Sequence, residues 1–367
     1  MNTNTKISLL EHLKNMHQEY KNLPKKEKRD FWVNFILNNA IIIIFLIFII
    51  YVWIYCYVTA GDNFLSLNSI VNLIDRTAFS CFLALGVAGV IVLTGTDLSA
   101  GRALGFIACI TASLLQKSGL ANKMWPNLSP PSVLLIFLLA IAIGAVIGVF
   151  NGFFTAKFKM HPFIATLGSQ LILSGLTLMY LNMGKNGGVT ISGIDQRYFD
   201  AVNSTKYFGL VLPFPHYVLY AVIAIFITWF MWNKTTLGKN MYAVGANPDA
   251  ATVSGVSVFW TTVLLFIFAG IMYGVSGFVD SARVGSNNAS TGVGYELNAI
   301  AACVIGGVSF TGGVGKVRGI LIGVLLLQLV TVGLQWVKMA PYFQSIITGF
   351  IILFAVAVDM RKYIAKK

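Results

Sequence analysis

Long apolar runs separated by short polar stretches make up most of the chain after residue 35. Each run carries little or no charge and is long enough to cross roughly 30 Å of hydrocarbon at about 1.5 Å per residue. The pattern predicts ten membrane-spanning helices: Ala40–Val58, Thr77–Thr96, Leu98–Gln116, Val133–Ala156, Pro162–Gly184, Tyr217–Asn233, Val256–Val279, Leu297–Gly315, Gly319–Val337 and Pro341–Val358. Whether the third and eighth cross completely stays open. We expect an all-α polytopic membrane protein.

The composition agrees with a lipid environment. Hydrophobic residues make up 57% of the chain and charged residues 11%, against roughly 45–50% and about 25% in soluble domains, which excludes a globular cytosolic protein. The net charge of +13 does not indicate a nucleic-acid partner, because the basic residues flank apolar runs instead of forming one face. The four cysteines lie inside apolar runs and are interpreted as packing residues.

The positions of the basic residues predict an orientation. Residues 1–34 form a polar, basic tail, followed by the transmembrane domain at 35–367. With the N-terminus in the cytoplasm, the two tails and the loops near 97–102, 157–161, 234–255 and 316–318 hold 18 of the 26 lysines and arginines. Positive charge gathers on the cytoplasmic side of membrane proteins. The loops 117–132, 185–216 and 280–296 are then external.

A polar island at Gly238–Val256, within the cytoplasmic loop 234–256, predicts one short helix. Asn247 suits its N-cap, Pro248 its first turn and Asp249 its positive end, and Gly255 ends it about two turns later. Because the helix faces the cytoplasm between two spans, it is the natural contact for a soluble partner.

Two halves of the chain, roughly 77–184 and 256–358, share an order of motifs. Val92–Gly101 lines up with Val304–Gly313, and each places a Gly-rich break in an apolar run. Small-xxx-small pairs follow, at Gly144/Gly148 and Gly319/Gly323, and are interpreted as helix packing. Lys-Met-His-Pro-Phe at 159–163 then answers Lys-Met-Ala-Pro-Tyr at 338–342. We predict a parallel tandem repeat.

The two breaks are the candidate transport path. Polar, glycine-containing interruptions free backbone groups that must be satisfied by protein or by a water-filled cavity, and matched interruptions indicate a transport route. The path and gate candidates are Thr96, Asp97, Ser99, Ser309, Phe310 and Thr311. The alternative for the first break is structural: Asp97 or Ser99 caps the next helix, with Arg102 as charge partner.

Catalytic, cofactor and metal motifs are not apparent in the sequence. Gly312–Val317 resembles a phosphate loop only superficially, because it lacks the first glycine and the Ser or Thr after Lys316. The four histidines do not form a metal cluster, and no nucleophile–base arrangement is present. Most central spans also lack the ionisable residues that ion coupling requires. We therefore expect a transporter without enzymatic activity whose energy comes from another subunit.

Four stretches carry a resemblance to a known family, and together they extend over most of the chain after residue 35. They are Leu93–Gly101 with Thr-Gly-Thr-Asp-Leu-Ser-Ala-Gly, His161–Gly168 with His-Pro-Phe-Ile-Ala-Thr-Leu-Gly, Gly238–Val256, and Glu296–Gly315 with Ala-Ile-Ala-Ala-Cys-Val-Ile-Gly-Gly-Val-Ser-Phe. The chain resembles the membrane subunits of ATP-binding cassette (ABC) sugar importers of the ribose/galactose/xylose type. Gly-Thr-Asp-Leu-Ser-Ala-Gly-Arg favours the galactose branch. Two departures are the long polar tail and His161, where threonine often precedes Pro-Phe.

The resemblance implies a bacterial inner-membrane permease that pairs with a second copy of itself. A separate ABC ATPase would bind ATP and Mg, and an extracytoplasmic sugar-binding protein would deliver the sugar. Asn247–Gly255 would be the coupling helix, with ATPase contacts at Asn247, Pro248, Asp249, Ala250, Ala251, Ser254 and Gly255. The alternatives left open are import of ribose, xylose or a nucleoside-like solute, and a stand-alone channel or facilitator.

Overall fold

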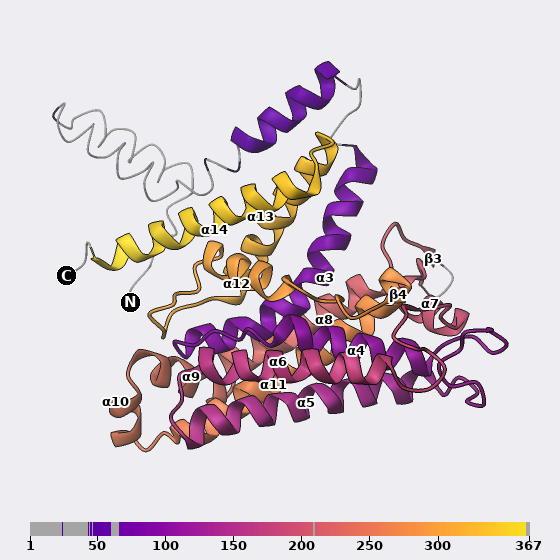
Figure 1. Ribbon diagram of the computed structural model, residues 1–367. Helices are drawn as coiled ribbons and strands as arrows, with labels where there is room; N and C mark the ends of the chain where they lie inside the picture. The colour runs from indigo at the N-terminus through magenta and orange to yellow at the C-terminus, as the bar shows by residue number, and fades with distance from the viewer. Residues whose placement is uncertain are drawn as a thin grey trace, which may run out of the picture.

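The computed structural model describes residues 47–59, 66–207 and 210–364, with Pro24, Ile43 and Phe45 as isolated positions. The protein is mostly helical (Figure 1). After the helix Ile47–Thr59, the helices are α3 Leu67–Val92, α4 Ala100–Leu114, α5 Val133–Lys157, α6 Pro162–Leu181, α7 Gln196–Asn203, α8 His216–Lys234, α9 Thr236–Ala246, α10 Pro248–Val253, α11 Val258–Val284, α12 Tyr295–Ile305, α13 Val317–Trp336 and α14 Pro341–Ile364. The predicted tail at 1–34 lies, except for Pro24, outside the described residues.

Six of these helices, α3, α5, α6, α8, α11 and α13, are long and apolar enough to cross a membrane. The third and eighth predicted spans correspond to α4 and α12, which have 15 and 11 residues. At about 1.5 Å per residue, neither covers roughly 30 Å of hydrocarbon. The chain is a multi-pass membrane protein, whereas the total of ten spans stays a prediction.

Helix α3 begins earlier than the apolar run indicates. The predicted span starts at Thr77, but the helix starts at Leu67, where the Ser66 hydroxyl accepts the amide N–H of Ser69. The difference arises because Asp75 and Arg76 end the uncharged run without ending the helix. The N-terminal part of α3 therefore brings charged side chains close to the membrane domain.

The helices form two layers. A slab of α4, α5, α6, α8 and α11 lies below α12, α13 and α14, and α3 contacts both layers (Figure 1). Between α5 and α11 the backbones almost touch: a Cβ atom on Gly144 would lie 2.1 Å from the carbonyl oxygen of Gly270. In the upper layer a Cβ on Gly323 would lie 2.0 Å from the oxygen of Ala302. Both predicted small-xxx-small pairs are thus confirmed as packing contacts.

The loops predicted to be external meet at one end of the slab. Strand β1 (Ile191–Ser192) pairs antiparallel with β4 (Ser286–Asn287), and β2 (Lys206–Tyr207) with β3 (Leu210–Val211). The Gln116 side chain at the end of α4 donates to the carbonyl of Ser192, 3.0 Å away, and accepts the amide of Met124. These contacts join all three loops into one cap.

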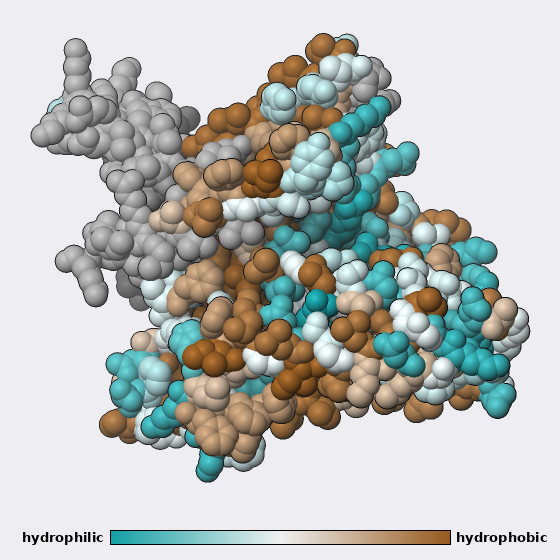
Figure 2. Space-filling model, viewed as in Figure 1, coloured by the Kyte–Doolittle hydropathy of each residue, from teal (hydrophilic) through white to brown (hydrophobic). Residues whose placement is uncertain are grey.

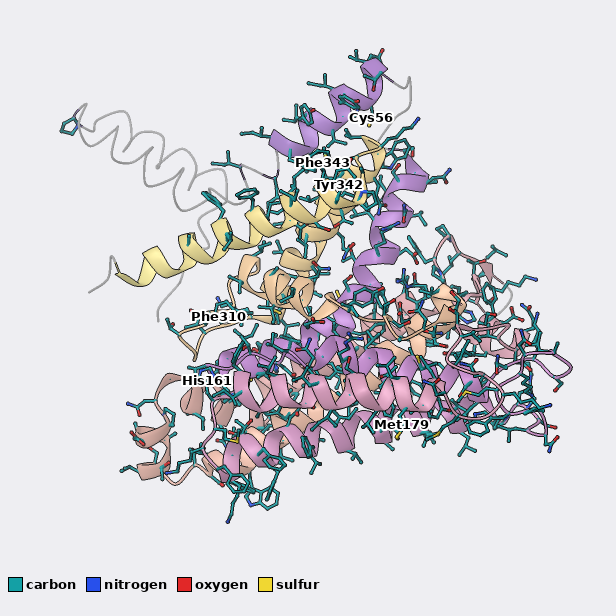
Figure 3. All side chains as sticks on the ribbon, viewed as in Figure 1. Cys56, His161, Met179, Phe310, Tyr342 and Phe343 are labelled. Carbon is teal, nitrogen blue, oxygen red and sulfur yellow. The ribbon has the colours of Figure 1, made fainter. Side chains whose placement is uncertain are left out.

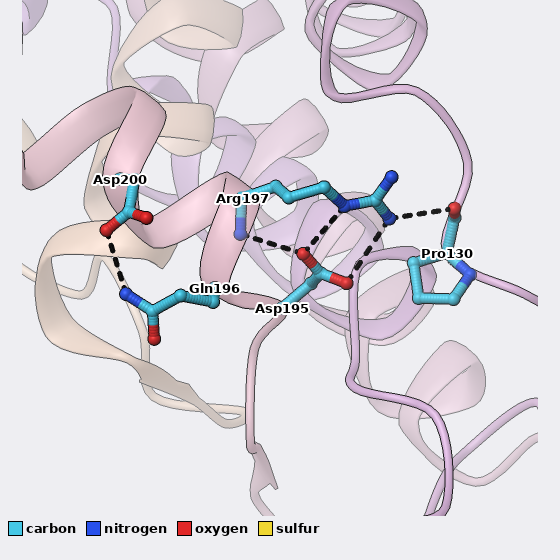
Figure 4. Close-up of polar contacts among 5 residues, drawn as sticks. All are labelled: Pro130, Asp195, Gln196, Arg197 and Asp200. Atoms are coloured by element: carbon cyan, nitrogen blue, oxygen red, sulfur yellow. Dashed lines mark hydrogen bonds and ion pairs between the residues drawn. The ribbon is translucent and has the colours of Figure 1, made fainter.

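Helix α7 begins in this cap with a charged pair. The Asp195 carboxylate accepts the amide of Arg197 at 2.8 Å and the Arg197 guanidinium at 3.1 Å, while Arg197 also reaches the carbonyl of Pro130 (Figure 4). The hydrogen bonds from Arg197 lower the pKa of Asp195 from its ordinary value. The negative charge is favourable at the N-terminus of α7.

Candidate functional site

The polar island folds as two helices, so the prediction of one short helix is wrong for its first half. Residues before Asn247 form α9, which begins where the Thr235 hydroxyl accepts the amide of Gly238. The predicted helix is α10: the Asn247 side chain accepts the amide of Ala250 at 3.0 Å, and Pro248 and Asp249 occupy its first turn. Sequence reasoning missed α9 because its polar and small residues resemble a loop, although they form a helix against the bundle.

Helix α10 ends as the sequence predicts and projects from the bundle. Gly255 adopts a φ of 82°, and the amide of Val256 closes the end on the carbonyl of Ala251. In α10 and its end, Ala251 is buried, whereas the side chains on either side of it are exposed, including Val253 at 91%. Figure 1 shows α10 at the outer edge of the slab, beyond α9. The seven candidate contact residues therefore form one short helix with a large free surface.

Helix α9 joins this projecting element to both breaks. A Cβ on Gly245 would lie 2.0 Å from the carbonyl oxygen of Val92, at the first break, and 2.7 Å from the amide of Gly313, at the second. That amide donates to the oxygen of Val92 at 2.9 Å. Tyr242, one turn earlier on α9, donates to the carbonyl of Gly315 at 3.0 Å. Three separate segments are held together by backbone contacts that only a glycine permits.

The first break is held in place by buried hydrogen bonds. Asp97 and Ser99 are both fully buried (0% exposed). One carboxylate oxygen of Asp97 accepts the Ser99 amide at 2.9 Å and the Ser99 hydroxyl at 2.6 Å, while the other accepts the Tyr273 hydroxyl from α11 at 2.9 Å. Asn151 on α5 donates to Ser99 at 2.8 Å. The break thereby ties together α4, α5 and α11.

The half-buried Thr96 is held from α6. The Thr166 hydroxyl oxygen lies 3.1 Å from the carbonyl oxygen of Thr96 and accepts the amide of Leu98 at 3.1 Å. A Cβ on Gly95 would lie 2.6 Å from the ring of Pro162, the first residue of α6. Helix α6 therefore begins against the first break.

Arg102 is not the partner of Asp97. Its guanidinium donates to the carbonyl of Ala289 at 2.8 Å, in the loop before α12. Ser99 occupies the N-cap position of α4 without a side-chain capping bond, because its hydroxyl is bonded to Asp97. The structural alternative thus holds in changed form: Asp97 fixes the start of α4 through Ser99, and Tyr273 takes the place predicted for Arg102.

The second break is a local loop near α9. Ser309 is buried and Phe310 half-buried against the core, whereas Thr311 is exposed. The Ser309 and Thr311 hydroxyl oxygens are 3.0 Å apart, and the amide of Ser309 bonds to the carbonyl of Val314. Figure 3 shows Phe310 near the same end as His161, which precedes α6. The loop also borders a cavity of about 460 Å³ between α8, α9 and α13, lined in part by Asn233, Tyr242 and Lys316.

Matched turns support the correspondence between motifs. Among described residues other than glycine, a positive φ occurs at Thr94, Lys159 and Lys338, and each lies in a repeated motif. Lys159 and Lys338 each come shortly before a helix that begins with proline. However, α4 lies between the break and Lys159 in the first half, and the corresponding interval of the second half holds α13 alone. A parallel tandem repeat therefore stays a prediction.

Three residues of the first-break network, Asn151, Thr166 and Tyr273, were not predicted from sequence. Each is a lone polar side chain in an apolar run, a pattern equally typical of exposed or self-bonded positions in helices. Thr166 lies within the resembling His-Pro-Phe-Ile-Ala-Thr-Leu-Gly stretch, which is the one signal that could have found it.

The comparisons with known proteins agree with this architecture. The family model described as branched-chain amino acid transport system / permease component matches residues 69–356. The chain belongs to this family. It is 42% identical to the galactose/methyl galactoside import permease protein MglC of Escherichia coli (strain K12), over 83% of this chain and 90% of that protein. No solved structure matches.

Other relatives carry related names. MglC of Haemophilus influenzae is 40% identical over 84% of this chain and 91% of its own length. The ribose import permease protein RbsC of Escherichia coli (strain K12) is 32% identical over 83% of this chain and 89% of its own length. The predicted resemblance to sugar importer permeases is therefore confirmed.

Proposed function

We propose that the chain is the membrane-spanning permease of an ABC importer for a monosaccharide, namely galactose or a methyl galactoside. The observation that carries the proposal is the 42% identity to a galactose/methyl galactoside import permease over nearly its whole length, against 32% to a ribose import permease. The helical membrane fold with a projecting helix between α8 and α11 is compatible with this role.

In this proposal α10 is the coupling helix. An ATPase that moves during its cycle needs a contact that is accessible to it and firmly joined to the bundle. The exposed side chains of α10 provide the first requirement. The second is provided by α9, which ends at Asn247, where α10 begins, and packs backbone to backbone at Gly245 against both breaks. Movement of α10 would thus displace the end of α3 and the loop that precedes α13.

The proposed assembly contains two copies of this chain and a separate ABC ATPase that holds ATP and Mg. The N-terminus and α10 face the cytoplasm, and the cap of β1, β4 and α7 faces a soluble sugar-binding protein on the outside. Thr96, Asp97, Ser99, Ser309, Phe310 and Thr311 remain candidates for a gate. Because Asp97 and Ser99 are fully buried, they would act there by holding helices in place.

Purification of the native complex tests the class of transporter. An importer permease is expected to co-purify with an ATPase chain and, in proteoliposomes, to take up galactose only with ATP inside. Passive uptake without an ATPase would establish the stand-alone channel instead. Competition with galactose, methyl galactoside, ribose, xylose and leucine tests the solute, since the family description names branched-chain amino acids. Inhibition by leucine alone would overturn the sugar assignment.

Asp249→Lys tests the coupling contact. Reversing this charge on exposed α10 is expected to lower galactose uptake at least about tenfold, because like charges at an interface are strongly unfavourable. Lys157→Glu at the end of α5 is the control, since it reverses an exposed charge that lies outside both α10 and the external cap. Both variants should reach the membrane at normal levels. Normal uptake by Asp249→Lys would remove the coupling role from α10.

A further inference from the structure

A cavity with several polar groups on its walls lies between α3, the end of α11, α12 and α13. Its volume is about 170 Å³, enough for roughly ten water molecules at one probe sphere each. The residues that carry polar groups into it are Arg76, Ser80, Arg283, Tyr295, Asn298 and Gln328. Figure 2 shows hydrophilic residues gathered over the first half of α3, between the two layers. Folding of a membrane domain does not require a cavity with polar groups on its walls.

The position of the cavity along the helices suits a solute that is crossing the membrane. On α3 it extends from Arg76 to Leu83, and Leu83 precedes the end of the helix at Val92 by nine residues, or roughly 14 Å. On α13 it lies at Val324–Gln328, near the middle of a 20-residue helix. The cavity is therefore well removed from the coupling end and extends from the predicted outer edge of the spans, at Arg76 and Arg283, to the middle of α13. Polar groups that reach into a membrane domain are costly and usually functional.

One wall combines aromatic rings with a guanidinium group. The Arg283 guanidinium lies 4.1 Å from the centre of the Phe79 ring, and Phe79 meets Tyr295 edge to face with ring centres 6.1 Å apart. Arg283 also pairs with Asp280 at 3.1 Å. Its Nε is buried and has no hydrogen-bond partner within the described part of the chain. A buried donor without an acceptor costs free energy. A bound solute that accepts this hydrogen bond would remove that cost.

The facing wall supplies both donors and acceptors. The Gln328 amide donates to the Ser80 hydroxyl oxygen at 2.7 Å, which leaves the amide oxygen as an acceptor and the Ser80 proton as a donor. The Asn298 amide, on α12, provides one group of each kind and is exposed. A wall that offers both donors and acceptors is complementary to hydroxyl groups, because each hydroxyl both donates and accepts hydrogen bonds.

The charges around the cavity balance. Arg76 and Arg283 line it, Asp280 pairs with Arg283, and Asp75 precedes Arg76 and accepts the Tyr217 hydroxyl. Two arginines accompanied by two aspartates do not favour an anion or a cation. They favour a neutral solute rich in hydroxyl groups.

From these observations, and resting on the proposed import of a monosaccharide, we infer that this cavity is the site where the permease itself contacts the neutral sugar during passage. Asn298 and Gln328 bind the hydroxyl groups, and Phe79 and Tyr295 form an apolar surface beside them. The two breaks then hold the helices in position around this site.

The test uses the complete importer, with its ATPase and binding protein, in proteoliposomes. Asn298→Ala and Gln328→Met are each expected to lower maximal galactose uptake about fivefold, the loss of roughly one hydrogen bond. Half-saturation should stay unchanged, because the binding protein sets it. Asn182→Ala removes an exposed amide at the end of α6, outside the cavity, and should transport normally.

A labelling experiment provides an independent readout. All four native cysteines are buried, so Asn298→Cys and Asn182→Cys each add one accessible thiol. Galactose is expected to slow modification of Asn298→Cys at least threefold and to leave Asn182→Cys unaffected. Equal labelling rates with and without galactose, together with normal uptake by Asn298→Ala and Gln328→Met, would overturn the inference. Wild-type galactose uptake in the same vesicles would still support the proposed function, so the two can fail separately.

Discussion

The two Gly-rich breaks align in sequence but are built differently. In the first, Asp97 is fully buried and its carboxylate accepts three hydrogen bonds, from Ser99 and from Tyr273 on α11. In the second, Ser309 bonds within its own loop and Thr311 is exposed. The first break joins three helices through side-chain hydrogen bonds, whereas the second contacts α9 and Val92 through its glycine backbone.

This difference shows what the repeated motif encodes. In each break a residue of positive φ stands two positions after the end of the helix, Thr94 after α3 and Gly307 after α12, although the alignment places Thr94 opposite Gly306. The repeat thus specifies a way to stop a helix within a membrane domain. The polar residues that follow are free to serve different purposes, so equal positions in the alignment do not imply equal roles.

Gly245→Val is the largest expected perturbation, because Gly245 lies against both breaks at once. The new side chain would overlap the carbonyl of Val92 and the amide of Gly313. Overpacking typically costs about 1–3 kcal/mol, and here both obstacles are backbone. We expect almost complete loss of uptake and a lower unfolding temperature for the purified protein.

Gly168→Ala is the matched control for that variant. Gly168 also lies in a helix, α6, but a Cβ there would meet nothing within 4 Å. Its substitution should leave uptake and unfolding temperature nearly unchanged. A Gly245→Val protein as stable and active as Gly168→Ala would show that α9 is not held against the breaks.

Asp97→Asn is expected to have the next largest effect and distinguishes the breaks directly. The amide retains one acceptor oxygen but turns a donor toward a group that now donates to the carboxylate, and leaving such a buried group unsatisfied costs about 1–3 kcal/mol. We expect roughly a tenfold loss of uptake. Thr311→Ala, at the exposed position of the second break, should change uptake less than about twofold.

The outcome separates three interpretations of Asp97. Unchanged uptake and unchanged sugar-stimulated ATP hydrolysis in Asp97→Asn would leave it as a simple helix cap. Reduced uptake with a normal unfolding temperature would favour a gate. A decrease in both uptake and unfolding temperature would favour a structural role, in which Asp97 holds the helices together. Equal effects of Asp97→Asn and Thr311→Ala would remove the distinction between the breaks.

Sequence reasoning succeeded where short-range chemistry decides the structure. Asn247, Pro248 and Gly255 predicted the start and end of α10 because a cap, a proline and a glycine act within one turn. Apolar runs predicted most long helices for a similar reason, since the hydrocarbon thickness fixes their length.

Long-range partners were beyond the reach of the sequence. Tyr273 is 176 residues from Asp97, and no local pattern marks it as a partner. The polar cavity was missed because Arg76 and Arg283 lie at the edges of predicted spans, where charges usually only set orientation. The start of α3 was misplaced for the same reason.

The smallest expected effect concerns the two turns that make the breaks alike. Gly307 has a φ of 81° and open space at its Cβ position, so Gly307→Ala introduces backbone strain alone. An L-residue in this region costs about 1–2 kcal/mol, which should lower the unfolding temperature of Gly307→Ala by a few degrees at most. Thr94 already bears that strain at a φ of 64°, and its exposed side chain recovers little by burial. Thr94→Gly is therefore expected to raise the unfolding temperature slightly, measured by thermal denaturation of the purified permease. The Thr94 methyl group also lies against Gly312, 2.3 Å from where a Cβ on that residue would stand. A fall in both variants would mean that this contact outweighs the strain at Thr94, and that the first break is held by packing as well as by hydrogen bonds.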